Sequence, residues 1–445
     1  MAFDLRLRFG TDGVRAPADQ LSSDEVRALG RAAARVLGTE RWIIGRDTRE
    51  SGPRIESALA DGFAAEGAAV TLLGVLPTPA VACASRELGA PAAVISASHN
   101  SYADNGIKLF AAGGRKLADG VQVDIERAMA DTDRPSSSSG SVTSDDTFAS
   151  RYVDWLISTM EGRRLDGITV AIDAAHGAAH AVGPLVLDAL GADIVAINVA
   201  PNGRNINDRA GSQHPEGVRE AVLAAGADVG LALDGDADRV FAVDASGGIV
   251  DGDQIMAMCA LDLRDRGRLT DDTLVVTVMS NLGLRLAMRA KGITVEETPV
   301  GDRYVLEVLD DRGLSLGGEQ SGHVIFHDLA PTGDGLLTGI RVLDLMKRTG
   351  RSLADLASVM TRLPQVLVNV PVRGGDGLAA KVASEVDEAE RRLAGRGRVL
   401  IRPSGTEALV RIMVEAPTED EAAQVAGHLA DVVAQAGDSS GDSSS

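Results

Sequence analysis

Short apolar runs alternate with helical patterns through the first part of the chain. Residues 41–44 and 69–76 are rich in strand-forming side chains, and residues 23–37 show the apolar spacing of a helix. This alternation is typical of βαβ units, in which a helix connects neighbouring strands of one sheet. It predicts a mainly parallel sheet in an α/β fold.

The same pattern restarts at residues 168–173 and again at 273–279, where an apolar run precedes a loop of small residues. A chain of 445 residues is too long for a single hydrophobic core, because domains usually hold about 100 to 150 residues. We therefore expect three related α/β domains with mainly parallel mixed sheets, at residues 1–151, 152–250 and 251–365.

The pattern changes after Pro364. Glu421 lies three residues after Thr418, which is the spacing of a capping box and predicts the start of a last helix. We expect a smaller α+β domain at residues 366–436 and a disordered tail at 437–445. The elements predicted before that helix are a strand, a helix and a pair of strands around a turn, at residues 366–372, 378–393 and 403–405 respectively.

A polar stretch at residues 131–146 lies near the first domain boundary. It includes four consecutive serines that begin at Ser136. Such a composition is typical of flexible connections. We expect a mobile linker or an excursion on the surface.

The chain is strongly acidic, with 44 Lys+Arg against 64 Asp+Glu and a net charge of −20. A surface this negative repels nucleic acids and anionic membranes. We therefore expect neither as a partner, and any phosphorylated ligand requires a local basic pocket.

The two cysteines, Cys83 and Cys259, lie far apart and have no Cys-x-x-Cys spacing. Neither a disulfide framework nor a zinc site is indicated. The charged N-terminus lacks the pattern of a signal peptide, and no apolar run has the length of a membrane span. We expect a cytoplasmic protein.

Three aspartates, Asp234, Asp236 and Asp238, alternate with small residues in the sequence L-A-L-D-G-D-A-D-R. Carboxylates this close repel one another unless a cation neutralises them, and oxygen ligands suit magnesium or calcium. An EF-hand is excluded, because Arg239 and Ala245 stand where that loop requires glycine and glutamate. The pattern indicates a metal loop, and a solvated acidic turn is the alternative.

An apolar run leads directly into S-A-S-H-N, which contains Ser96, Ser98 and His99. Ligands of parallel α/β sheets bind beyond the carboxyl ends of the strands, so this position favours a functional role. Serine and asparagine are also ordinary turn and helix-cap residues. The residues alone do not show which serine matters.

The sequence I-R-P-S-G-T-E-A-L-V-R forms a predicted turn between two strands of the last domain. Hydroxyl and main-chain N–H groups of this turn, with two flanking guanidinium groups, suit a phosphate. A hairpin turn that only reverses the chain is the alternative. The residues concerned are Arg402, Ser404, Gly405, Thr406 and Arg411.

The segment G-G-E-Q-S-G-H follows another predicted strand. Glu319 and Ser321 suit a pair of sugar hydroxyls, and the glycines allow close approach of a ligand. His323 is a candidate acid or base, although a single histidine after a turn is more often a structural residue.

Two further loops, F-G-T-D-G-V-R-A and G-R-D-T-R-E-S-G, combine glycines with arginines. Arg15 or Arg46 can hold a phosphate, or can form an ordinary ion pair with Asp12 or Asp47. Neither loop decides the function alone.

Taken together and in this order, the six motifs closely resemble those of the α-D-phosphohexomutase superfamily, and within it those of the bacterial phosphoglucosamine mutases. The motifs extend over residues 9–407, which is most of the chain. The resemblance implies four domains around a central cleft, the last of them lid-like. It also implies a magnesium-dependent isomerase that interconverts glucosamine 6-phosphate and glucosamine 1-phosphate, supplying amino-sugar nucleotide precursors for the bacterial cell wall.

The resemblance also implies the roles of individual residues. Ser98 is the serine that is phosphorylated, and its phosphate is a fourth metal ligand. Lys108 and Arg15 match catalytic groups, and Arg239 and His99 lie near the phosphate. The metal ligands are Ser98, Asp234, Asp236 and Asp238; the sugar loop contains Glu319 and Ser321; the non-reacting phosphate binds Arg402, Ser404, Gly405, Thr406 and Arg411.

The sequence departs from the family pattern in a few places. Ser101 and Ala408 stand where many relatives have proline, and Gln213 replaces a threonine. Gln320 stands where glucose and mannose enzymes typically have methionine, which favours glucosamine phosphate as substrate. The alternatives are a phosphomannomutase or phosphoglucomutase, and a non-catalytic phosphosugar-binding protein. A homodimer is compatible with the sequence, which does not determine the oligomeric state.

Overall fold

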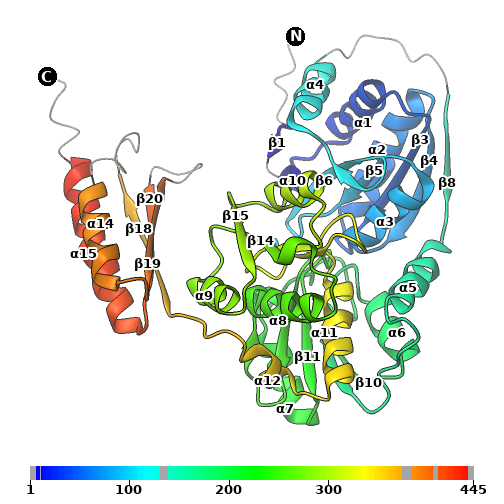
Figure 1. Cartoon of the computed structure of the whole chain (residues 1–445). Coiled ribbons are helices and arrows are strands. Elements are labelled where there is room, and N and C mark those ends of the chain that lie inside the picture. The colour runs from blue at the N-terminus through cyan, green and yellow to red at the C-terminus, as the bar shows by residue number, and fades with distance from the viewer. Residues whose placement is uncertain (1–6, 11, 131–138, 373–381, 404–408, 439–445) are drawn as a thin grey trace, which may run out of the picture. The chain divides into compact units, whose positions relative to one another are not determined.

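The computed structural model describes residues 7–10, 12–130, 139–372, 382–403 and 409–438 (Figure 1). The chain forms two compact units. One contains residues 1–279 and 292–359, and the other contains residues 280–291 and 360–445.

The first sheet of the larger unit is mixed. Its strands are β1 (Phe9–Gly10), β2 (Gly13–Pro17), β3 (Arg41–Arg46), β4 (Ala69–Val75), β5 (Ala92–Ile95), β6 (Asp104–Ala111), β7 (Arg115–Lys116) and β8 (Ser141–Ser144). Their order is β1-β2-β6-β5-β3-β4-β8, and β7 pairs with β6. Strand β3 is parallel to β4 and β5, whereas β6 is antiparallel to β5 and β2.

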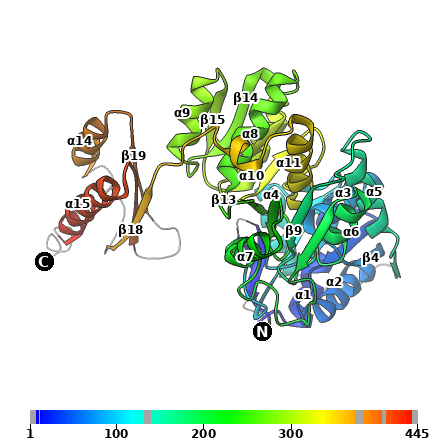
Figure 2. The ribbon, with the colours of Figure 1, turned by 90° about the horizontal axis from the view of Figure 1, so that it is seen from below.

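Four helices accompany this sheet: α1 (Ser23–Leu37), α2 (Gly52–Ala65), α3 (Thr78–Leu88) and α4 (Asp119–Met129). Helices α1 and α2 lie side by side (Figure 2). The predicted helix at 23–37 is confirmed, and the Ser22 hydroxyl caps it by accepting from the Glu25 main-chain N–H. Phe63 of α2 stacks on Trp42 of β3 with ring centroids 3.9 Å apart, which helps to hold the helix against the sheet.

The second sheet has the order β10-β9-β11-β12-β13. Its strands are β9 (Thr169–Asp173), β10 (Asp193–Ile197), β11 (Val229–Leu233), β12 (Val240–Asp244) and β13 (Ile249–Val250); the helices are α5 (Phe148–Ser158), α6 (Val182–Ala189) and α7 (Glu216–Ala225). Strands β10, β9 and β11 are parallel, and β11 and β12 form an antiparallel hairpin. The loop of that hairpin contains the three aspartates.

The third sheet has the order β15-β14-β16-β17. Its strands are β14 (Thr273–Thr277), β15 (Thr294–Thr298), β16 (Leu316–Gly318) and β17 (Val324–Phe326); the helices are α8 (Gly252–Asp265), α10 (Asp302–Arg312), α11 (Gly335–Thr349) and α12 (Leu353–Ala357). Helices α8 and α11 pack against each other (Figure 2). Asp251 and Gln254 form a capping box that starts α8.

The smaller unit contains an antiparallel sheet of order β18-β20-β19. Its elements are β18 (Gln365–Pro371), β19 (Arg398–Pro403), β20 (Leu409–Glu415), α14 (Ala383–Leu393), α15 (Glu419–Asp438) and, from earlier in the chain, α9 (Leu282–Ala290). The Thr418 hydroxyl accepts from the Glu421 main-chain N–H at the start of α15, as the capping-box spacing predicts.

The expected fold class, three α/β domains and a smaller α+β domain, is confirmed. The structure describes only part of two segments for which flexibility was expected. Within the polar stretch at 131–146, residues 141–144 form β8, which pairs in parallel with β4, and residues 131–138 lie outside the described part. The expected disordered tail begins at residue 437, but α15 continues to Asp438, and residues 439–445 lie outside the described part. No described helix is long and apolar enough to cross a membrane.

Candidate active site

Ser98 lies in the loop between β5 and β6 and is 1% exposed. Its φ angle is 50°, in the left-handed region that residues other than glycine rarely adopt. The Ser98 Oγ donates a hydrogen bond to Asp234 Oδ2 at 2.7 Å, and the Ser98 main-chain N–H donates to Ser96 Oγ at 2.9 Å. The first serine of the motif therefore supports the loop, and the second presents its hydroxyl to the aspartates.

Two side chains hold this strained loop by its carbonyl oxygens. The Arg49 guanidinium donates to the carbonyls of Ser98 and Asn100 at 3.0 and 2.8 Å. The Asn207 amide donates to the same two oxygens at 2.8 and 2.9 Å. Arg49 is fully buried and pairs with Asp47 at 2.8 Å. Its charge is thus neutralised where water is excluded.

The G-R-D-T-R loop therefore contributes through an arginine that the sequence did not single out. Arg46, the arginine considered for phosphate binding, pairs instead with Glu56 at 3.2 Å. Burial raises the pKa of the Asp47 carboxyl, while Arg49 and the Ser96 hydroxyl, which donates to Asp47 at 2.6 Å, oppose that rise. Asn207 had no sequence signal, because its partners are main-chain atoms from a distant segment.

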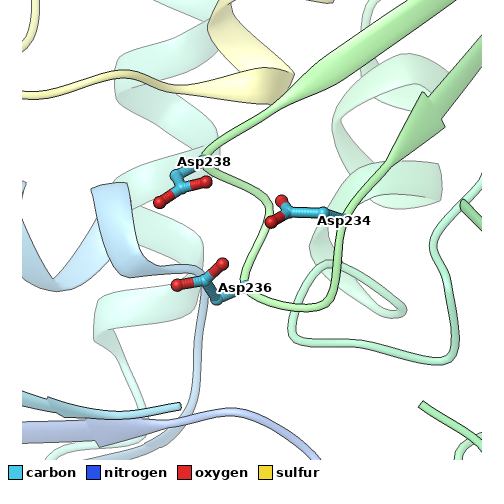
Figure 3. Close-up of side chains that lie close together, drawn as sticks. All are labelled: Asp234, Asp236 and Asp238. Atoms are coloured by element: carbon cyan, nitrogen blue, oxygen red, sulfur yellow. The ribbon is translucent and has the colours of Figure 1, made fainter. Parts of the chain in front are cut away.

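The three aspartates of the β11–β12 loop are all buried, and oxygen atoms from each lie within 4.8 Å of one another. Figure 3 shows the three carboxylates on one turn of chain, around a common space. Gly235 is required between them, since a Cβ there would lie 2.5 Å from the Ser98 carbonyl oxygen. Among the described residues, neither Asp236 Oδ1 nor Asp238 Oδ1 has a hydrogen-bond partner. Two buried, unpartnered carboxylate oxygens fit a metal site.

The pKa values of two of these carboxylates are shifted in opposite directions. Burial, followed by repulsion from Asp238 and Asp236, raises the pKa of Asp234 well above its usual range. Burial also opposes ionisation of Asp236, but the charge of Lys108 and a hydrogen bond from Thr78 outweigh it and lower the pKa of that carboxyl. The Thr78 hydroxyl donates to Asp236 Oδ2 at 2.7 Å. Thr78 lies just beyond β4 and is a further residue that the sequence did not single out.

Lys108 projects from β6 into the same cluster and is 4% exposed. Its ammonium lies 2.9 Å from Asp236 Oδ2, 3.2 Å from Asp238 Oδ2 and 2.9 Å from Asp12 Oδ2. Burial disfavours the charged form, but these three carboxylates raise the pKa of Lys108 well above its usual range. The three carboxylates therefore favour the cationic form of Lys108.

A cavity of about 520 Å³ opens beside this cluster. It is lined by loops from all three sheets of the larger unit and includes three arginines, Arg8, Arg15 and Arg239. Burial, with the charges of Arg239 and Arg15, lowers the pKa of His99 to about 4. The Nδ1 atom of His99 lies 3.1 Å from a guanidinium nitrogen of Arg239. Arg15 donates a hydrogen bond to Asn100 Oδ1 at 3.3 Å. This wall is cationic in a protein of strongly negative charge.

The G-E-Q-S-G-H segment contributes a carboxylate and an imidazole to the cavity. Glu319 and His323 line the cavity. The Glu319 carboxylate accepts from the Gly301 main-chain N–H at 3.1 Å and from the Ser321 hydroxyl at 3.4 Å. Gln213, which departs from the family pattern, is exposed on a 3-10 turn and does not line this cavity.

The predicted phosphate loop of the last domain is described only in part. Arg402 and Arg411 are directly paired across β19 and β20. Ser404, Gly405 and Thr406 lie outside the described residues. The proposed phosphate site there stays a prediction.

Four family models match the chain in succession. They are described as phosphoglucomutase/phosphomannomutase alpha/beta/alpha domains I, II and III and the C-terminal domain. They match residues 6–136, 150–247, 251–363 and 367–432, respectively.

Curated relatives match along nearly the whole length. A phosphoglucosamine mutase of Nocardioides sp. is 53% identical over 441 residues, covering 96% of this chain and 98% of the relative. One from Saccharopolyspora erythraea is 52% identical over 438 residues, with coverage of 96% and 98%.

Solved structures share the fold at lower identity. A phosphoglucomutase/phosphomannomutase family protein from Burkholderia thailandensis has a TM-score of 0.81 at 24% identity, covering 96% of this chain and 97% of that one. An Aspergillus fumigatus N-acetylphosphoglucosamine mutase, solved with GlcNAc-6P and magnesium, has a TM-score of 0.70 at 18% identity, with coverage of 97% and 96%. The motif resemblance is confirmed, and the chain belongs to the phosphoglucomutase/phosphomannomutase family of α-D-phosphohexomutases.

Proposed function

We propose that the protein is a phosphoglucosamine mutase, which interconverts glucosamine 6-phosphate and glucosamine 1-phosphate. One observation carries the proposal: the buried Ser98 hydroxyl lies 2.7 Å from a carboxylate of a metal-type cluster, beside an arginine-lined cavity. The names of the relatives that are 50–53% identical support the choice of substrate.

In the proposed reaction, phosphorylated Ser98 donates its phosphoryl group to a hydroxyl of the sugar monophosphate. The bond from phosphorus to Ser98 Oγ breaks as a bond to the sugar oxygen forms, and the proton of the sugar hydroxyl is transferred to Ser98 Oγ, which becomes a free hydroxyl. The resulting bisphosphate turns over and returns its other phosphoryl group to Ser98. Such transfers depend chiefly on positioning and charge neutralisation.

The chain's own residues divide these tasks. Arg49 and Asn207 hold the Ser98 loop, and Arg15 and Arg239 face the transferred group with positive charge. Lys108 is proposed to assist at the reacting oxygen. Asp234, Asp236 and Asp238, with the Ser98 phosphate, would hold Mg²⁺, which supplies further neutralisation of charge when bound.

The remaining groups are proposed to bind the rest of the substrate. Glu319 and Ser321 accept the sugar, and a carboxylate beside the Gln320 amide favours an ammonium group at carbon 2. Arg402 and Arg411, with residues 404–406, are proposed to bind the non-reacting phosphate. Both cysteines are buried free thiols, which supports a cytoplasmic location.

The test compares kcat/KM for glucosamine, glucose and mannose 6-phosphates at one Mg²⁺ concentration. The glucosamine compound is expected to give the highest value. A clear preference for glucose or mannose phosphate would reject the substrate and leave the mechanism standing.

A Ser98→Ala variant is expected to lose turnover while remaining folded. Ser96→Ala is the comparison, and mass spectrometry locates the phosphate.

A further inference from the structure

Lys116, at the end of β7, lies between two carboxylates at the wall of the cavity. Its ammonium is 2.5 Å from Asp12 Oδ1 and 2.7 Å from Asp302 Oδ2. The Lys116 side chain is 14% exposed, and both aspartates line the cavity. No motif of the family resemblance contains this lysine.

Each carboxylate has a second cationic or titratable neighbour. Asp12 Oδ2 is 2.9 Å from Lys108, and Asp302 Oδ2 is 3.5 Å from His323 Nε2. Lys116 therefore stands in the middle of a chain of contacts that begins at Lys108 and ends at His323. The residues involved belong to segments in and around the first and third sheets.

The pKa values of Asp12 and Asp302 in this series of contacts both depend on the charge of Lys116. Burial opposes ionisation of Asp12, but Lys108 and Lys116 hold its pKa well below the usual range. Burial likewise opposes ionisation of Asp302, and Lys116 followed by His323 lowers its pKa. If the Lys116 charge is removed, the contacts described here leave Asp12 with one cation, Lys108. They leave Asp302 with the imidazole of His323.

We propose that Lys116 is a positioning residue for the mutase reaction. It bridges Asp12, which contacts Lys108, and Asp302, which contacts His323, and so keeps Lys108 and His323 in place at the cavity. This inference rests on the proposed function. Asp12 is otherwise free to draw Lys108 away from Asp236 and Asp238. A shift of about 1 Å in such a group is enough to slow catalysis by roughly 100-fold.

The same two elements offer a matched control. Arg115, the residue before Lys116 in β7, pairs with Asp310 of α10 at 3.0 Å and is 64% exposed. This pair also joins β7 to α10 but lies outside the cavity lining. If Lys116 served only to hold those elements together, Arg115→Met and Lys116→Met would have similar effects.

The experiment measures kcat and KM of the full-length enzyme with glucosamine 6-phosphate, together with Tm and the fraction of phosphorylated Ser98. Lys116→Met is expected to lower kcat at least 10-fold at an unchanged phosphorylated fraction. Lys116→Arg, which keeps a cation able to pair with both carboxylates, is expected to recover most of that loss. Arg115→Met is expected to stay within twofold of the wild type.

A kcat for Lys116→Met within twofold of the wild type, or an equal loss in Arg115→Met, would overturn the inference. If the wild type itself converts none of the three sugar phosphates, the proposed function fails instead. Should Lys116→Met not fold, Asp302→Asn breaks the same chain of contacts from the other side. It must then lower kcat at least 10-fold, and a value near that of the wild type refutes the positioning role.

Discussion

At the scale of single residues, the position of the Ser98 hydroxyl is set by what holds the main chain around it. A φ of 50° is unfavourable for serine, and the loop keeps it because Arg49 and Asn207 bind the same two carbonyl oxygens. Local strain of this kind costs about 1 to 3 kcal/mol. The two side chains thus offset strain beside the Ser98 hydroxyl.

Replacement of Asn207 tests this arrangement. Asn207→Ala removes two hydrogen bonds while Arg49 keeps its own, so stability is expected to fall by only about 1 to 2 kcal/mol. Because the serine is held less precisely, kcat is expected to fall about 10-fold with KM nearly unchanged. Asn205→Ala is the control, since Asn205 bonds within its own loop, to Ala200 and Asn202. Equal kinetic losses in both variants would contradict the assignment.

The metal cluster can be tested without an activity assay. Asp236→Asn removes one formal charge and a strong oxygen ligand, so the Kd for Mg²⁺ measured by calorimetry is expected to rise at least about 10-fold. Asp228→Asn is a suitable comparison, because Asp228 is exposed and, among the described residues, its side chain accepts from the Thr169 main chain in the same domain. An unchanged Kd for Asp236→Asn would remove this carboxylate from the metal site.

The sequence singled out the candidate chemical residues of the site but not the residues that support them. Asp234 follows a buried strand in a distinctive motif, so the strand end and side-chain chemistry were sufficient to single out its loop. The same reasoning found the loop of Ser96 and Ser98, but only the family resemblance distinguished Ser98 from Ser96. Arg49 and Asn207 bind main-chain oxygens, which every residue possesses, so no pattern of residue types announces the contact. Their role depends on distances that only the folded chain defines.

At the scale of elements, α11 begins at a buried carboxylate. Asp334 accepts from the Leu337 main-chain N–H at 2.9 Å and from the Tyr152 hydroxyl at 2.8 Å. Burial nevertheless raises the pKa of Asp334 to about 6, and the charge of Asp238 adds to the rise. Since the folded state binds this proton more tightly than the unfolded state, stability from Asp334 is complete below about pH 4 and is lost as pH rises through 6.

Asp334→Asn is therefore expected to change the pH dependence of stability. The amide can still accept from Leu337 and can donate to Tyr152, but it has no charge to desolvate. At pH 7.5 the variant should be more stable than the wild type by on the order of 2 kcal/mol. The difference should vanish near pH 4, as measured by urea unfolding at both pH values. A difference independent of pH would show that Asp334 is not ionised with this penalty.

The elements also differ in how far the sequence predicted them. Helix α1 has an apolar face and a Ser22 cap, so both its existence and its bounds were predictable. Strand β8 has four exposed residues and no apolar alternation. It is a strand only because its main chain pairs with β4 at the edge of the sheet, and such pairing leaves no mark on composition.

At the scale of the whole molecule, one buried carboxylate connects two segments of the smaller unit that are far apart in the sequence. In the smaller unit, fully buried Glu415 accepts from Arg398 at 2.7 Å and from the Leu282 main-chain N–H at 2.8 Å. The second contact caps the start of α9. One carboxylate thus joins residues 280–291 to the three-stranded sheet.

Glu415→Gln is expected to weaken this unit. The variant puts a neutral amide in place of the carboxylate that pairs with Arg398, and breaking a buried pair in this way costs about 3 to 5 kcal/mol. Hydrogen exchange at residues 282–290 should accelerate together with the loss of stability. Glu421→Gln, which affects an exposed pair with Arg396, is expected to change stability by less than about 0.5 kcal/mol. Slow exchange in α9 of the Glu415 variant would argue against the tie.

The cavity of the larger unit is lined by residues from both ends of a long stretch of sequence, from Arg8 to His323. During synthesis, the Ser98 loop leaves the ribosome more than 200 residues before His323. At about 5 to 20 residues per second, that gap lasts roughly 10 to 45 s. For that interval a nascent chain has its serine but no wall opposite it, so translation itself delays the first turnover until the third sheet has emerged and folded.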